Sequence, residues 1–270
     1  DLEASAIGDD YCRRQIQNQT NGHFTTDGLA PYMRYSFAGG NDGVSENAAA
    51  WSANYAFNER ALYEMSRRSE DAMMAESAPH DGHKRTILDP HATHVGIGLA
   101  WEGSEFRLVH EFVRRYVKWT RPLPRRARVG DNVLVAGQPL DGAHVEAISV
   151  HYEPAPVAMP ASLANSIDNY SLPSKRKEYF PRLKQEYTKR EDGTIEIVRR
   201  EYSGGHRGDF TVGKDGSFSF AVPFTQGAGV YTVVVWVRRD RAELPVSASN
   251  VSIRVDNAVP ATARASAASR

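Results

Sequence analysis

The sequence predicts an α+β protein, in which a mainly helical first part precedes an all-β, immunoglobulin-like antiparallel sandwich. Three observations support this. Residues 1–113 contain two stretches with helical spacing, and residues 114–129 form a basic run with two prolines. Residues 130–257 contain seven short β-branched or aromatic runs separated by turn residues. We expect residues 258–270, which are low in complexity, to be a disordered tail.

The composition excludes several classes of function. The chain has 270 residues, 41% of them hydrophobic, so it can bury a core. Its 33 Lys and Arg residues balance its 33 Asp and Glu residues, and we therefore expect no nucleic-acid partner. No apolar run approaches the ~18 residues of a membrane span, so no transmembrane segment is expected. The single cysteine, Cys12, cannot form an internal disulfide and is expected to be buried.

The first part is expected to combine helices with a little sheet. Apolar residues at helical spacing predict one helix over residues 2–18 and a second over residues 55–77. "HVGIGLAW" at residues 94–101 predicts a short buried strand. "FRLVHEFVRRYV", which begins at Phe106, alternates with period two and predicts the hairpin partner of that strand.

The stretch "SENAAAW", residues 45–51, allows two interpretations. Ser45 and Asn47 could start a helix, with Glu46 in the first turn facing the positive end of the helix dipole. Alternatively, Glu46 points inward to a site whose other members lie elsewhere in the chain. The second interpretation needs a cation, a metal or several donors, because a glutamate is costly to bury alone.

The middle of the chain changes character. Residues 114–129 carry two prolines and seven Lys or Arg residues, and we interpret them as an interdomain linker or edge. The alternative is a basic patch for an anionic polymer or a membrane surface. In the second part, Lys214-Asp215-Gly216 predicts a tight hairpin turn. The charged insertion over residues 154–190 is expected to be functional or mobile.

Four short motifs in the first part occur in a characteristic order. A histidine, His23, precedes an Asp-Gly turn and an arginine, and a Glu-Asn pair that begins at Glu46 follows a glycine-rich turn. Gly-His-x-x-x-Ile-Leu contains His83, and Val-Gly-Ile-Gly begins at Val95. Together, over residues 20–112, they resemble the CAP superfamily of cysteine-rich secretory, antigen 5 and pathogenesis-related proteins, in its disulfide-poor bacterial branch.

The resemblance implies an α-β-α sandwich for residues 1–113, with a cleft that holds a divalent metal, for which we expect zinc. Matched by motif, the metal-binding residues are His23, His83, Glu46 and, at the end of the preceding helix, Glu76. Their chemistry fits this role, because neutral imidazole is the commonest protein ligand for zinc and carboxylates orient or join such ligands.

The resemblance also implies a setting and a class of function. We expect a secreted, periplasmic or cell-surface protein that binds an extracellular lipid, polysaccharide or protein. The alternative is a metal-dependent hydrolase of peptide or ester bonds, in which Glu46 or Glu76 is the catalytic general base on a metal-bound water. A third possibility is a purely structural polar network. Four other histidines of the first part are expected to have surface or packing roles: His80, His91, His94 and His110. The three in the second part are expected on the surface: His144, His151 and His206.

Overall fold

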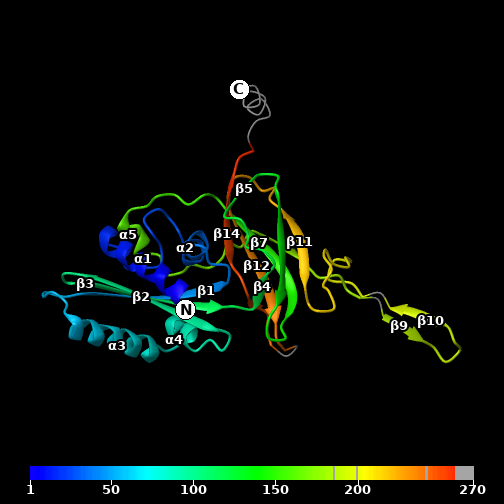
Figure 1. Cartoon of the computed structure of the whole chain (residues 1–270), viewed down its shortest axis with the longest axis horizontal. Helices are drawn as coiled ribbons and strands as arrows, with labels where there is room; N and C mark the ends of the chain where they lie inside the picture. Colours follow the sequence, from blue (N-terminus) through cyan, green and yellow to red (C-terminus); the bar gives the residue numbers. More distant parts are fainter. Residues whose placement is uncertain (185, 199, 241–242, 259–270) are drawn as a thin grey trace, which may run out of the picture.

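The structure is a computed structural model that describes residues 1–184, 186–198, 200–240 and 243–258 (Figure 1). These residues form fourteen strands and five helices. The predicted fold class, an α-β-α sandwich followed by a separate immunoglobulin-like sandwich, is wrong, because the protein is a β-rich fold whose two parts share a core. Within the described ranges, no helix combines the length and the apolar character needed to cross a bilayer.

The first part is built on a three-stranded antiparallel sheet in the order β1-β3-β2. Both helices predicted here are confirmed, and so is the hairpin of β2 and β3. The elements are α1 (Leu2–Asn18), α2 (Pro31–Phe37), β1 (Gly43–Ser52), α3 (Glu59–Ala75), α4 (Gly82–Ile87), β2 (His94–Glu102) and β3 (Glu105–Arg114).

"SENAAAW" is not a helix start but the middle of strand β1. This strand pairs with β3 over its full length, from Gly43 opposite Arg114 to Ser52 opposite Glu105. The pairing overrides the helix preference of the three alanines in the stretch. Because strand side chains alternate, Glu46 faces the side of α1 and α2, whereas the next residue faces the side of α3 and α4.

Helix α1 lies against β2 at a distance that only glycine permits. A Cβ atom built on Gly98 would overlap the backbone of Gly8 and Asp9. The same helix covers the free edge of β2, because the Asp9 carboxylate accepts a hydrogen bond from the amide of Leu99 at 2.8 Å. An edge strand protected in this way is less able to pair with another chain.

We expect the substitution Gly98→Ala to lower the free energy of unfolding by roughly 1–3 kcal/mol, because a methyl group forced into close-packed backbone must displace it. Urea denaturation measures this change. Gly82→Ala is the matched control, since a Cβ at Gly82 would meet no atom within 4 Å. Equal free energies of unfolding for the two variants would contradict the packing described for α1 and β2.

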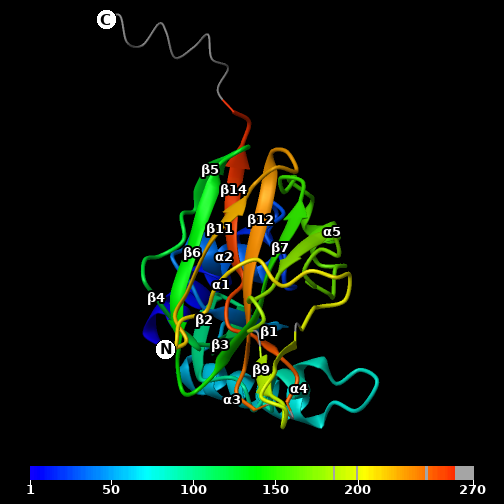
Figure 2. The same cartoon turned by 90° about the vertical axis from the view of Figure 1, so that its right-hand side faces the viewer.

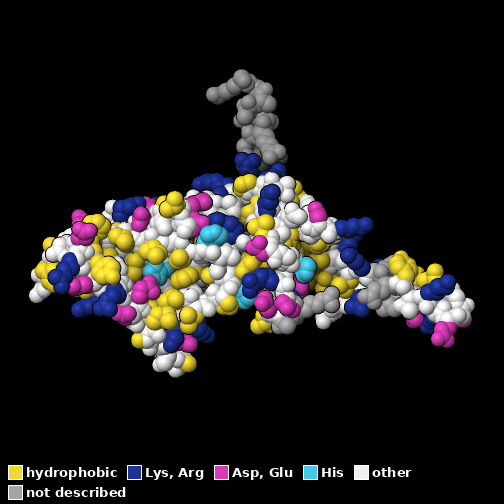
Figure 3. Space-filling view, turned by 60° about the horizontal axis from the view of Figure 1, so that its bottom comes forward, with side chains coloured by type: hydrophobic (Ala, Val, Ile, Leu, Met, Phe, Trp, Pro, Cys, Tyr) yellow, Lys and Arg dark blue, Asp and Glu magenta, His cyan; other side chains and the backbone are white. Residues whose placement is uncertain are grey.

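The face of β2 that α1 does not cover carries exposed apolar side chains. Ile97 and Trp101 expose half of their surface, at 50% and 51%. Figure 3 shows hydrophobic side chains spread over the part of the surface that holds this sheet and its helices. The sheet is therefore fully packed on its α1 face and only partly covered by α3 on the other.

In the second part, two sheets pack face to face around an apolar core (Figure 2). One has the order β5-β14-β12-β7-β8 with β13 beside β12, and the other has the order β11-β6-β4. A separate hairpin, β9-β10, projects from the body (Figure 1). The bounds are β4 (Val117–Trp119), β5 (Arg126–Arg128), β6 (Asn132–Pro139), β7 (His144–Glu153), β8 (Arg176–Tyr179), β9 (Glu186–Lys189), β10 (Ile195–Val198), β11 (Phe218–Pro223), β12 (Gly229–Arg238), β13 (Val246–Ser247) and β14 (Val251–Asp256).

The two parts are joined by a common core, and this overturns the predicted separate sandwich. Val230 of β12 belongs to the same apolar cluster as Tyr35 of α2 and Val44 of β1. The side-chain amide of Asn250 pairs with the backbone of Val44, accepting from its amide at 3.2 Å and donating to its carbonyl at 2.9 Å. Buried polar pairing of this kind fixes the relative position of the two parts.

The basic segment 114–129, predicted as a linker or edge, contributes β4 and β5 to the two large sheets. Several of its cations have partners in the first part: Arg115 forms ion pairs with Asp1 at 2.7 Å and with Asp42 at 2.9 Å. These ion pairs neutralise positive charge that the alternative interpretation, a basic patch, assigned to an anionic polymer or a membrane surface. The predicted tail 258–270 falls, from residue 259 onward, outside the described residues.

The insertion over residues 154–190 packs back against the first part. It contains the short helix α5 (Ala161–Ala164) before β8. The side chain of Asn165 donates to the carbonyl of Gln19 at 3.2 Å and accepts from the amide of Asn21 at 2.9 Å. These two hydrogen bonds hold the residues that follow α5 over the loop that contains His23.

Candidate functional site

The first half of the candidate site is the pair formed by His23 and Glu46. His23 lies in the loop after α1, and its Nδ1 atom is 2.8 Å from Oε1 of Glu46. The Glu46 side chain is fully buried, whereas 13% of the His23 side chain is exposed. The carboxylate therefore orients the imidazole from inside the protein and leaves its opposite nitrogen, Nε2, free of this contact.

The second half is the equivalent pair of His83 and Glu76. Glu76 follows α3 directly, and its Oε1 atom lies 2.5 Å from Nδ1 of His83. Its other oxygen accepts from the backbone amide of His83 at 3.0 Å and, more weakly, from that of Lys84 at 3.3 Å. Asn47 fixes the same turn from the sheet by donating to the carbonyl of His83 at 3.0 Å. Glu76 thus joins α3 to the start of α4.

The structure brings all four predicted residues together. The imidazole rings of His23 and His83 have centroids 6.5 Å apart and are tilted by 34°. In both, Nδ1 is bound by a carboxylate, and within the described residues neither Nε2 atom has a hydrogen-bond partner. Each imidazole therefore has a carboxylate at Nδ1 and an Nε2 atom that is available to a ligand.

Sequence reasoning missed the two charged residues that lie beneath Glu46. Arg34 of α2 donates hydrogen bonds to the Glu46 carboxylate and, at 2.6 Å, to the carbonyl of His23. Its guanidinium stacks on the ring of Tyr11 at 3.4 Å. Glu111, directly opposite Glu46 in the β1–β3 register, is fully buried, 3.9 Å from Arg34. Neither of its carboxyl oxygens has a hydrogen-bond partner among the described residues.

This cluster contains two carboxyl groups, those of Glu46 and Glu111, but only one guanidinium group, that of Arg34. This imbalance and the burial of the cluster shift the pKa values of its members. Burial raises the pKa of Glu46 to about 7, although the charge of Arg34 opposes the shift. Burial, and then the neighbouring Glu46 charge, raise the pKa of Glu111 well above its ordinary value. Burial and the positive charge of Arg34 lower the pKa of His23 to about 4. With a pKa of about 4, the imidazole of His23 is uncharged at neutral pH.

Tyr170 completes the site from the charged insertion. Its hydroxyl accepts from the amide of Glu46 and donates to the carbonyl of Glu46, both at 2.7 Å. Its ring contacts that of His23 with centroids 4.7 Å apart. Tyr170 is 124 residues from Glu46 in sequence, so no local pattern could indicate the contact. For Glu111 a signal existed, because strand alternation and register place it opposite Glu46.

Other histidines differ from the expectation only in detail. His110 is buried on the α3 face of β3, where its Nε2 atom lies 2.9 Å from Glu70, so the predicted packing role is confirmed. His151 was expected on the surface, but it is 3% exposed. Its Nδ1 atom donates to the carbonyl of Pro173 at 2.7 Å, because the returning insertion covers it. Cys12 is buried on α1, as predicted.

The donors fit an open, weakly held metal. Histidines that bind metal commonly donate their other N–H group to a carboxylate, which is the arrangement of both pairs here. The centroid separation of 6.5 Å is about 1 Å wider than the roughly 5–5.5 Å that two imidazoles on one tetrahedral zinc would show. Within the described residues, no three His, Cys, Asp or Glu side chains converge as a ready-made cluster. His23 and His83 would therefore hold the ion, with Glu46 and Glu76 as orienting residues.

The same contacts engage both glutamates that the hydrolase alternative would use as general base. The Glu46 carboxylate is buried and is engaged by both His23 and Arg34. Glu76 accepts hydrogen bonds on both oxygens. A general base needs a carboxylate oxygen within reach of the water that it deprotonates. In this site the carboxylates orient imidazoles and stabilise the fold.

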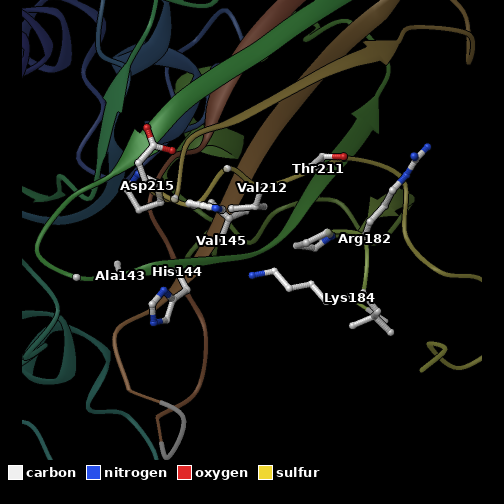
Figure 4. Close-up of a pocket in the computed structure, with 15 residues that line it drawn as sticks. Ala143, His144, Val145, Arg182, Lys184, Thr211, Val212 and Asp215 are labelled. Carbon is white, nitrogen blue, oxygen red and sulfur yellow. The ribbon is translucent and has the colours of Figure 1, made fainter. Parts of the chain in front are cut away.

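A separate hollow of about 780 Å³ lies in the second part, between the β6–β7 turn and the segments at residues 181–184 and 211–216. Figure 4 shows Lys184 extending toward Val145 and His144, whereas Arg182 and Asp215 point away from the centre. No imidazole–carboxylate pair is formed there among the described residues.

No protein-family profile and no curated protein matches this chain. The likeness to the CAP superfamily rests on the four short motifs alone.

Proposed function

We propose that the protein is an extracellular binding protein that uses the His23 and His83 site to take up a divalent metal, zinc in the first instance. The observation that carries this proposal is that the same imidazole–carboxylate arrangement occurs twice in the site. Each imidazole is bound at Nδ1 by a carboxylate, and the two ring centroids lie 6.5 Å apart. The motif resemblance to secreted CAP proteins motivates the extracellular setting.

Electrostatics supports a neutral, metal-ready His23. The burial and the Arg34 charge that lower its pKa keep the imidazole unprotonated at neutral pH, and only the unprotonated nitrogen binds a metal. When bound, the ion would supply a positive charge and open coordination positions for an oxygen or nitrogen ligand. The protein's own contribution is to hold both rings through Glu46 and Glu76 and to exclude water from Glu46.

Isothermal titration calorimetry with zinc at neutral pH tests the proposal. We expect about one ion per chain, and we expect the double substitution His23→Ala, His83→Ala to abolish the binding heat. Glu76→Gln should weaken binding about 10–100-fold, because it removes an orienting partner without removing a ligand. The exposed pair His94→Ala, His144→Ala is the control and should leave binding unchanged.

Circular dichroism of each variant first establishes that it is folded. If wild-type protein binds no zinc, or if the His23 and His83 double variant binds it undiminished, the metal-binding proposal is refuted.

A further inference from the structure

The outer face of the β7–β12 pair carries a groove floored by a tryptophan, far along the chain from the histidines. Trp236 of β12 lies opposite Ala147 of β7, near the end of the ladder that joins these strands. It lines a hollow of about 460 Å³. Ligand pockets typically have volumes of about 300–1,000 Å³.

The indole of Trp236 is held in a fixed orientation. Its Nε1 atom donates to the hydroxyl of Ser149 at 2.8 Å, and that hydroxyl is 3.0 Å from Nε2 of the buried His151. The register of β12 shifts between Trp236 and Val237, an irregularity that re-aims a strand side chain. Because the residue opposite is alanine, no large side chain competes for the space beside the ring.

Two more aromatic residues line the groove. Phe180 and Tyr202 have ring centroids 4.9 Å apart, and Tyr202 stacks on His206 at 5.2 Å with an angle of 23°. The Tyr202 hydroxyl donates to the carbonyl of Pro181 at 2.8 Å, which fixes its ring as well. The groove therefore presents flat apolar surfaces whose orientation is set before any ligand arrives, and this lowers the entropic cost of binding.

The charged residues around these rings are balanced. Arg176 pairs with Glu178 at 3.1 Å, and Arg238 pairs with Glu146 at 3.2 Å, so two cations and two anions line one groove. Each carboxylate side chain is about two-fifths exposed and retains lone pairs for further hydrogen bonds. The lining thus offers donors and acceptors without a net charge.

We propose that this groove binds the sugar rings of a neutral glycan. A pyranose has an apolar C–H face that packs on a flat aromatic ring, and a rim of hydroxyls that both donate and accept. Fixed indole and phenol rings match the face, and balanced Arg–Glu pairs match the rim. A nucleic acid or an anionic lipid would instead require an excess of cations. The proposal does not depend on the metal site.

Titration calorimetry and tryptophan fluorescence with soluble cellohexaose and chitohexaose test it. We expect at least one of these glycans to bind the full-length wild-type chain and to change its fluorescence. Trp236→Ala should weaken that binding about tenfold or more, since a central aromatic contact often dominates an interface. Trp101→Ala is the matched control, because it removes an exposed indole from a different sheet.

Trp236→Phe separates loss of binding from loss of folding, because it keeps an aromatic ring and removes only the hydrogen bond to Ser149. Binding of intermediate strength by this variant is the expected result. The proposal is overturned if neither glycan binds the wild-type protein, or if Trp236→Ala and Trp101→Ala bind equally well. A heparin oligosaccharide that binds more tightly than both neutral glycans, independently of Trp236, also overturns it.

Discussion

Replacing Arg34 by methionine is expected to lower the free energy of unfolding by roughly 3–5 kcal/mol at pH 8, the cost of removing one partner of a buried ion pair. Among the described residues, Arg34 is the only cation within ion-pair distance of Glu46 and Glu111. His23 also contacts Glu46 but is neutral. Without it, two buried acids face each other across the β1–β3 ladder. The stacking of the guanidinium on Tyr11 is lost as well.

The cost should be smaller at pH 5 than at pH 8. When Arg34 is absent, the carboxyl groups can avoid an uncompensated charge only by keeping their protons, and protons are more available at low pH. Urea denaturation of wild type and variant at the two pH values measures the difference. The double substitution Arg34→Met, Glu46→Gln should recover part of the loss at pH 8, because residue 46 can then carry no buried negative charge.

Arg107→Met is the matched control for this experiment. Arg107 is also buried on β3, but its acidic partner, Glu105, has a side chain that is 37% exposed and can be solvated. Its removal should destabilise the protein to a similar degree at pH 5 and pH 8. If Arg34→Met shows no more pH dependence than Arg107→Met, the assignment of Arg34 as the counter-charge of the two buried glutamates is wrong.

Local patterns predicted the elements of the first part better than their assembly. The helix over residues 2–18 and the hairpin of β2 and β3 follow from periodicity, because each is decided by neighbouring residues. Strand β1 was not recognised, because three consecutive alanines give no strand signal and its pairing with β3 comes from residues about sixty positions later. The predicted separate sandwich failed for the same reason. The contact of Asn250 with Val44 spans 206 residues.

For the candidate site too, the sequence predicted the members better than their arrangement. His23, Glu46, His83 and Glu76 could be selected from motifs, and the structure brings them together. What the motifs could not provide is their roles. Only the geometry reveals that the carboxylates bind Nδ1 of the imidazoles, and only the tertiary fold brings Tyr170 to the backbone of Glu46.

Glu111→Gln is expected to flatten the pH dependence of stability between pH 5 and pH 6.5. In the folded wild type, burial and the Glu46 charge hold the pKa of Glu111 far above its ordinary 4.5. A raised acid pKa contributes stability that is fully present below pH 4.5 and is lost as the pH rises toward the folded pKa. For one proton the loss is at most about 1.4 kcal/mol per pH unit, so across this range it cannot exceed about 2 kcal/mol.

The neighbouring shifts do not obscure this slope, because they oppose each other. The folded protein keeps a proton on Glu46, whose pKa is about 7, and the unfolded chain releases that proton near pH 4.5. The reverse holds for His23, which is neutral above about pH 4 when folded and binds a proton below 6.5 when unfolded. Between pH 4.5 and 6.5 the two contributions cancel, since both states carry one proton on this pair.

Urea denaturation at intervals from pH 5 to pH 6.5 measures the contribution of Glu111, including its coupling to Glu46 and His23, as the difference between wild type and variant. Glu105→Gln is the control from the same strand. Hydrogen bonds, first from Ser52 and then from Arg107, lower the pKa of Glu105, so its contribution is lost only as the pH falls below the ordinary 4.5. Its difference from wild type should therefore be constant over the measured range. A constant difference for Glu111→Gln as well would show that the pKa of Glu111 is not raised in the folded protein.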